Sequence, residues 1–319
     1  MCISLHFSTL LCYTTNQQKH FSTLKCHGRQ KGERDDGVVR DSERKVLKMK
    51  RKTALFASLL AAFALVAALM VGCGSPAADE NTEAGGTTFI VGFDQNFPPF
   101  GYMGEDGEFT GFDLDLAAEV CERNGWTVQY EPINWDAKDA MLNQGSITCI
   151  WNGFTMETRE DDYTFTDPYL LNGQVVVVRT DSGITSLDDL AGKNVITQID
   201  SAGLKLVSAG GEWEELGKSF GRLDTIPDYN TAMMNLEQAT CDAVIIDLLV
   251  ANYQIAGKEA TFQILDQPLS SEHYGVGFKV GNTEMADTVE STLREMYADG
   301  TVAELAAKYD IDMKNWLLK

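Results

Sequence analysis

Two charged side chains follow apolar runs of the kind that form buried strands. Arg159 comes shortly after the run at residues 147–151, and Asp247 directly follows the run at 243–246. A guanidinium group binds a carboxylate through two parallel hydrogen bonds, so Arg159 is suited to hold an anion. A carboxylate at the end of a buried strand is costly without a partner, so we expect Asp247 to have one. Both residues therefore point to the recognition of charged groups.

Residues for covalent or metal chemistry are scarce in the same part of the chain. His273 is its one histidine, because the other three lie before residue 73. This nearly excludes a histidine pair or a His-rich metal site. No two cysteines have Cys-x-x-Cys spacing, which argues against structural zinc. The sequence has no Walker A, Gly-x-Gly-x-x-Gly or Gly-x-Ser-x-Gly motif. We therefore expect no enzyme activity, no metal and no cofactor.

The charge of the chain divides it into two unlike parts. The formal net charge of the 319 residues is −21, with +7 in residues 1–72 and −28 in the remainder. Such an acidic body argues against a nucleic-acid partner, which needs clustered Lys and Arg. The length favours roughly two domains.

The elements that must position Arg159 and Asp247 form an α/β pattern. Up to residue 151, three apolar or alternating segments that predict strands enclose two helical segments. A strand at 175–178 then starts the pattern again, which predicts sheets with crossover helices. The predicted strands are 89–93, 126–130, 147–151, 175–178, 195–198, 243–246 and 274–278. The predicted helices are 113–124, 136–142, 186–190, 201–208, 229–239, 251 onward, 285–299 and 302–309.

The basic first part resembles a bacterial lipoprotein signal. A basic run at 48–52 precedes the uncharged apolar stretch 53–71, and Gly72 and Cys73 follow. The resemblance predicts a signal peptide at 49–72 and lipidation of Cys73. The alternative is a transmembrane anchor, because the 19 residues of the stretch could just span a bilayer. Both interpretations place the body at the cell membrane, on its extracytoplasmic (periplasmic or cell-surface) face.

The segments on either side of that signal have simpler interpretations. Residues 1–48 have no role in a signal peptide, so we interpret them as a non-native extension from a mis-assigned start, with initiation at Met49. Residues 73–88 are small, polar and acidic, and we expect a disordered tether. The remaining cysteines are Cys121, Cys149 and Cys241. Their odd number allows at most one disulfide, and we expect all three to be buried as small apolar residues.

Several motifs of the body occur together in one known order. The sequence Gly-Phe-Asp-Leu-Asp-Leu at 111–116 resembles the signature of family 3 bacterial extracellular solute-binding proteins. The loop at 93–100 before it, and the segments 147–155, 165–169, 186–193, 242–247 and 274–278 after it, are also similar to that family. The resemblance covers about residues 89–319. The family comprises polar amino acid receptors of ATP-driven (ABC) importers.

The resemblance implies a type II periplasmic-binding-protein-like fold. In this fold two α/β lobes, each a mixed or parallel sheet flanked by helices, are joined by two crossing segments and close on the ligand by hinge motion. It implies lobe 1 at 89–173 plus 275–319 and lobe 2 at 174–274. The implied partners are an amino acid ligand and the permease and ATPase subunits of an importer. We expect a monomer and no nucleic acid.

The resemblance also implies roles for residues around the ligand's charged groups. Arg159 matches the family's carboxylate-binding arginine, and its alternative is an ion pair with Glu157 or Asp162. Asp247 matches the ammonium-binding aspartate, with a helix N-cap as its alternative. Three further residues would complete this part of the site. They are Gly153 and Thr155 for the ammonium group, and Ser201, at a helix N-terminus, for the carboxylate.

Selection of the ligand's side chain is implied for a second set of residues. Phe97 and Trp135 match positions that flank the side chain, with core packing as the alternative. Asp94 matches a position that faces a polar or cationic tip, and Asn152 is a polar group at a strand end. Asp113 and Asp115 are expected as a helix cap and a solvated side chain.

Two other functions fit the same fold. One is a cyclohexadienyl-dehydratase-like enzyme, which needs a positioned acid in the cleft and consumes its ligand. The other is a ligand-sensing domain that acts through a partner. The complete set of residues for an amino acid head group favours the importer receptor.

Overall fold

The computed structural model describes residues 86–319. The predictions for the extension at 1–48, the signal at 49–72, Cys73 and most of the 73–88 tether lie outside these residues. Strand β1 already begins at Thr88. Within residues 86–319, no helix has the length and apolar character needed to cross a membrane.

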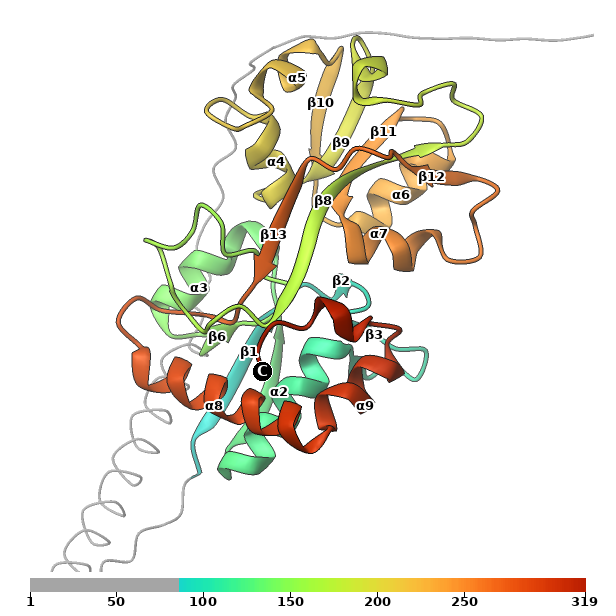
Figure 1. The fold of residues 1–319 in the computed structure, drawn as a ribbon. Helices are drawn as coiled ribbons and strands as arrows, with labels where there is room; N and C mark the ends of the chain where they lie inside the picture. Colours follow the sequence, from blue (N-terminus) through green and yellow to red (C-terminus); the bar gives the residue numbers. More distant parts are fainter. Residues whose placement is uncertain (1–85) are drawn as a thin grey trace, which may run out of the picture. The chain divides into compact units, whose positions relative to one another are not determined.

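The first of two large sheets has the strand order β5-β1-β6-β14-β7. β5 and β6 run parallel to β1, whereas β14 is antiparallel to both β6 and β7. Helices α2, α8 and α9 pack together beside this sheet (Figure 1). The strands are β1 Thr88–Phe93, β5 Thr127–Pro132, β6 Cys149–Ile150, β7 Thr164–Phe165 and β14 Gly277–Phe278; the helices are α2 Phe112–Asn124, η2 Trp135–Ala137, α3 Lys138–Gln144, α8 Thr283–Asp299, α9 Thr301–Lys308 and η4 Met313–Asn315.

The second large sheet has the order β10-β9-β11-β8-β12, and β13 also pairs with β8. Three of its six strands, β10, β9 and β11, are parallel to one another, as expected for strands joined by crossover helices. The strands are β8 Leu170–Arg179, β9 Asn194–Gln198, β10 Arg222–Ile226, β11 Ala243–Asp247, β12 Phe262–Ile264 and β13 Ser270–Tyr274; the helices are η3 Leu187–Leu190, α4 Ala202–Val207, α5 Glu214–Ser219, α6 Tyr229–Glu237 and α7 Leu248–Ile255.

Strands β8 and β13 connect the two sheets. They are antiparallel, and their pairing runs from Leu170 opposite Tyr274 to Gln174 opposite Ser270. Figure 1 shows both strands running from one sheet to the other. The predicted strand 274–278 is therefore two strands, because Tyr274 ends the pairing with β8 and Gly277 starts the pairing with β6. The predicted lobe boundaries fall inside β8 and directly after β13, and they stay a prediction.

The apolar runs of the sequence form the cores. The central strands β1, β8 and β11 are almost completely buried, as predicted from their uninterrupted apolar residues. Cys121, Cys149 and Cys241 are free and buried, as expected. The predicted α/β class with sheets flanked by helices is confirmed. The sequence did not predict several short elements, among them the small β2-β3-β4 sheet (Asn96–Phe97, Gly101–Met103, Phe109–Thr110).

Asp113 has a different role from the one predicted. Helix α2 starts at Phe112, with Gly111 as N-cap, so Asp113 lies inside the first turn. Its side chain is fully buried, and its Oδ2 accepts hydrogen bonds from the Gly153 N–H at 2.6 Å and the Tyr169 hydroxyl at 2.8 Å. The prediction of a cap or solvated group was wrong, because the first turn packs against the loop after β6. Burial raises the pKa of Asp113 to about 7.

Candidate functional site

A small central cavity lies where strand ends of the two sheets meet. Its volume is about 20 Å³. Seven of the nine predicted ligand-binding residues line it. The lining residues are Phe97, Trp135, Gly153, Thr155, Arg159, Gln198, Ser201, Ala202 and Asp247. This space is large enough for about one water molecule. A ligand larger than a water molecule therefore needs the surrounding parts to move apart.

Arg159 provides the buried positive charge of the central cavity. Only 3% of its surface is exposed. Its guanidinium donates to the carbonyl oxygens of Thr155 at 2.9 Å and Asp200 at 3.3 Å, and it lies 4.9 Å from the centre of the Phe154 ring. Within residues 86–319, no carboxylate forms an ion pair with it, so the surface pair with Glu157 or Asp162 is not formed. The bonds to carbonyl oxygens fix the group but leave its charge without an anion.

Asp247 provides the opposite charge, at the carboxyl end of β11. Its side chain is 5% exposed. Oδ1 accepts hydrogen bonds from the Tyr274 hydroxyl at 2.6 Å and from Asn172 Nδ2 at 3.1 Å. Asp247 stands at the N-cap position of α7, but its side chain makes no cap hydrogen bond. Asn172 Oδ1 accepts from the Leu249 N–H at 3.2 Å instead. Burial raises the pKa of Asp247, while the Tyr274 hydroxyl and the charge of Arg159 oppose that shift.

Glycine and hydroxyl groups complete the wall of the central cavity. Gly153 has φ 57°, a conformation that favours glycine, and a Cβ there would lie 2.9 Å from both Phe97 and Tyr274. Thr155 is 4% exposed and follows on the same loop. Ser201 Oγ caps α4 by accepting from the Leu204 N–H at 3.0 Å, and it lies 3.2 Å from the Thr197 hydroxyl.

Two predicted residues, Asp94 and Asn152, lie behind the central cavity instead of lining it. Asn152 Oδ1 accepts from the Asp94 N–H at 2.8 Å, so it holds the backbone after β1. Asp94 Oδ2 accepts from Gln198 Nε2 at 2.6 Å, a contact between the ends of β1 and β9. Burial raises the pKa of Asp94 to about 6, although bonds from the Asn96 N–H and Gln198 oppose the shift. Asp94 faces a neighbouring cavity of about 510 Å³, which Trp135, Asp136 and Asp228 also line.

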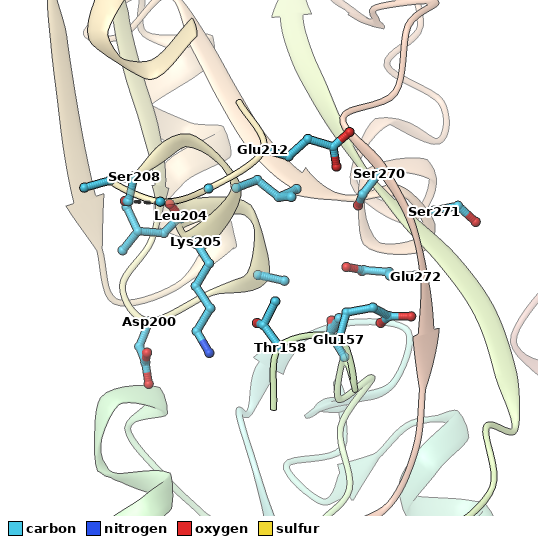
Figure 2. A pocket seen from close by; sticks show the side chains of 16 residues that line it. Glu157, Thr158, Asp200, Leu204, Lys205, Ser208, Glu212, Ser270, Ser271 and Glu272 are labelled. Carbon is cyan, nitrogen blue, oxygen red and sulfur yellow. Dashed lines mark hydrogen bonds between the residues drawn. The ribbon is translucent and has the colours of Figure 1, made fainter. Parts of the chain in front are cut away.

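A third, larger cavity adjoins the other side of the site. It has a volume of about 640 Å³, and we call it the outer cavity. It shares Thr155 and Ala202 with the central cavity. Figure 2 shows Lys205 on one side of it and Glu157 and Glu272 on the other.

Sequence reasoning missed two residues of this region, Gln198 and Glu272. Gln198 ends the predicted strand 195–198, so its position at a strand end was a usable signal. Glu272 lies on β13, in a polar stretch that alternates buried and exposed residues. That alternation is seen only in the structure, because the sequence of the strand is polar up to Tyr274.

The fold and the central cavity define an α/β protein with two large sheets and a buried cavity lined by side chains of opposite charge. The chain belongs to the bacterial extracellular solute-binding proteins, family 3, whose family model matches residues 89–311. The family predicted from the motifs is thus confirmed. Members of this family act outside the cytoplasm.

Named relatives agree with this assignment. The chain is 29% identical over 225 residues to the L-cystine-binding protein TcyJ of Escherichia coli (strain K12), a match that covers 70% of this chain and 82% of the relative. It is similar to the crystal structure of an ABC uptake transporter substrate binding protein from Streptococcus pneumoniae with bound histidine. That match has a TM-score of 0.66 and 31% identity, and covers 70% of this chain and 92% of the other.

One solved structure bears on the enzyme alternative. It is the ancestral amino acid-binding protein AncCDT-1, described as a precursor of cyclohexadienyl dehydratase. It matches with a TM-score of 0.63 and 27% identity over 70% of this chain and 95% of its own. The cystine-binding, histidine-bound and ancestral relatives are thus all binding proteins by description, including the one that leads toward an enzyme.

We expect Gly153→Ala to abolish ligand binding, because its Cβ would push Phe97 and Tyr274 out of the wall of the central cavity. Gly145→Ala is the matched control. Gly145 also has positive φ, 77°, but nothing lies within 4 Å of an added Cβ, so only backbone strain is introduced. Calorimetric titration and thermal melting of both variants test this. Unchanged affinity in Gly153→Ala would contradict the importance of this close packing.

Proposed function

We propose that this protein is the extracytoplasmic receptor of an amino acid ABC importer and binds a free polar amino acid between its two sheets. The observation that carries the proposal is the pair of buried opposite charges, Arg159 and Asp247, on one cavity. A free amino acid at neutral pH presents a carboxylate and an ammonium group on one carbon. The relatives named for cystine and histidine support the same ligand class.

The contacts of the site support a separate role for each charged group of the ligand. Arg159 takes the carboxylate, because its charge lacks an anion among the described residues, and the Ser201 hydroxyl adds a donor. Asp247 takes the ammonium group, together with the Gly153 carbonyl and the Thr155 hydroxyl. Each group of the ligand then replaces water with a charged partner, which gives shorter and stronger hydrogen bonds than neutral partners do.

The cavity beside Asp94 takes the side chain of the ligand. Phe97 and Trp135 line the central cavity, and Trp135 also lines the neighbouring cavity. Asp94, Asp136 and Asp228 line that neighbouring cavity. These three carboxyl groups favour a polar or cationic side chain. A cationic tip would replace Gln198 as the partner of Asp94.

Strands β8 and β13 serve as the hinge. They are the paired strands that connect the sheets, and bending them opens the central cavity without breaking either sheet. In this proposal the lobes are 89–173 plus 275–319 and 174–274, the protein is a monomer, and it releases its ligand unchanged.

The membrane anchor is part of the same proposal. Residues 49–72 act as a signal peptide that is removed, and lipid on Cys73 holds the receptor near the importer. Mass spectrometry of the protein purified from membranes tests this. We expect a mature N-terminus at Cys73 with a diacylglyceryl group, and Cys73→Ser should lack the lipid. A wild-type protein that retains residues 49–72 would contradict it.

A thermal-shift screen tests the ligand class. Residues 87–319, refolded to remove carried-over ligand, are screened against the standard amino acids and cystine. A ligand that binds only the native state at 100 times its Kd adds about 2.7 kcal/mol of stability. We expect a clear shift from one or a few polar amino acids, recovered unchanged after incubation. A flat screen would remove the proposal, and a consumed ligand would favour the dehydratase alternative.

The assignment of the charged groups has its own test. We expect Arg159→Ala and Asp247→Ala each to weaken binding by at least about 2 kcal/mol, because each leaves a charged ligand group unpaired in a closed cavity. The matched controls are Arg222→Ala and Asp224→Ala, an exposed ion pair on β10, with no expected effect on affinity. Calorimetric titration measures all four. Wild-type affinity in both site variants would remove the assignment.

A further inference from the structure

Two buried carboxyl groups meet behind the ammonium side of the central cavity. Asn172 Nδ2 lies 3.1 Å from Asp247 Oδ1 and 2.6 Å from Glu272 Oε1. Gln174 Nε2 donates to the same Glu272 oxygen at 2.9 Å, and the Tyr274 hydroxyl donates to Asp247 at 2.6 Å. Glu272 is 2% exposed and Asp247 5%. Residues of β8, β11 and β13 thus place both carboxyl groups around one amide.

The surroundings of this pair contain little positive charge. β8 contributes the neutral amides of Asn172 and Gln174, β13 contributes Tyr274, and α6 contributes the buried Tyr229. Arg159 acts on Asp247 from the central cavity, and Lys205 lines the outer cavity across from Glu272 (Figure 2). Within residues 86–319, no Lys or Arg forms an ion pair with either carboxyl group.

The neighbours of Glu272 on strand β13 also give it no positively charged partner. The imidazole of His273 contacts Glu157, with Nδ1 at 2.7 Å from Oε1, and no hydrogen bond joins it to Glu272 within residues 86–319. Ionising both of two buried carboxyl groups that contact the same Asn172 nitrogen is unfavourable, so they titrate as a pair. Burial and the charge of Asp247 raise the pKa of Glu272 to about 8.

We propose that Glu272 is a positioning residue of the ligand site, which shares one proton with Asp247 until the ammonium group of the ligand displaces that proton. The proposal rests on the proposed function, in which Asp247 binds the ammonium group. Before binding, the pair carries one proton and one negative charge. After binding, both carboxylates are ionised, the ammonium group keeps its protons, and the displaced proton has passed to water.

The outer cavity gives that proton a route. Glu272 lines it beside Glu157 and Ser271 (Figure 2), whereas Asp247 lines the central cavity. The pair therefore faces the ligand on one side and a wide cavity on the other. The proton leaves without crossing the closed ligand site.

The sign of the pH effect follows from this exchange. Binding releases a proton, so affinity rises with pH while the free protein still carries that proton, up to about pH 8, by at most tenfold per pH unit for one proton. Above that pH the free pair is already ionised, and the dependence ends. A receptor whose Asp247 ionises alone, at its ordinary pKa, would show no such change between pH 6 and 8.

Calorimetric titration of the full chain with the amino acid found by the screen tests this at pH 6.5, in two buffers of different ionisation enthalpy. We expect release of about one proton per ligand in the wild type and close to none in Glu272→Gln. The glutamine keeps the size of Glu272, accepts the bonds from Asn172 and Gln174, and offers an N–H to Asp247. Glu212→Gln is the control, because exposed Glu212 lines the same outer cavity. It should release as many protons as the wild type.

No release in the wild type, or equal release in Glu272→Gln and the wild type, would overturn the proposal. A second measurement needs no ligand. Protonated Glu272 stabilises the fold, and that stability is fully present below its ordinary pKa of 4.5 and lost as pH rises to about 8. The urea midpoint of the wild type should therefore fall relative to Glu272→Gln between pH 5 and pH 8. Asp94 and Asp113 also have raised pKa values, but both proteins contain them.

The two measurements separate the two proposals. A difference between the wild type and Glu272→Gln that is the same at all pH values overturns the proton sharing, whether or not any amino acid binds. A pH-dependent difference together with a flat amino acid screen keeps the shared proton and removes the proposed function.

Discussion

The burial of two opposite charges beside each other is the constraint on which the arrangement of strands depends. Arg159 and Asp247 are both at most 5% exposed, so each needs polar contacts that a single element cannot supply. Loop carbonyls hold the guanidinium, while Tyr274 and Asn172 hold the carboxylate. These contacts come from the loop after β6 and from β8 and β13. The crossing of strands between two sheets is therefore what makes a dry site with both charges stable.

The sequence predicted most of the fold because long apolar runs have one stable position, inside a sheet. β8, β9 and β11 were found in this way. The family was recognised from motifs on several elements, with its signature at the start of α2. Asp113 was misjudged for a physical reason: an aspartate at a helix start has the same local pattern whether it faces water or a packed loop. Glu272 and Gln198 were missed because their roles depend on partners about 100 residues away in the sequence. The strand end at Gln198 was visible in the sequence, but the distant partner of each residue was not.

The two ends of the ligand would be recognised by different means. The head group would meet fixed groups at strand ends, which suits a feature that every amino acid shares. The side chain would meet Asp94, whose present partner is the Gln198 amide from the opposite sheet. Recognition of a side chain would then compete with a contact that joins the two sheets. Specificity and closure would thus be linked through one hydrogen bond.

The pairing of β8 with β13 has a consequence for the history of the chain. Gln174 and Ser270 are opposite each other in that pairing, so the 95 residues between them leave and return at one point. A segment whose ends are neighbours can be inserted into, or exchanged between, host proteins without stretching the host backbone. The part of the chain that includes Ser201 and Asp247 is therefore a segment that can be exchanged as one unit. Recombination at this point would place this segment of one receptor between the two flanking parts of another.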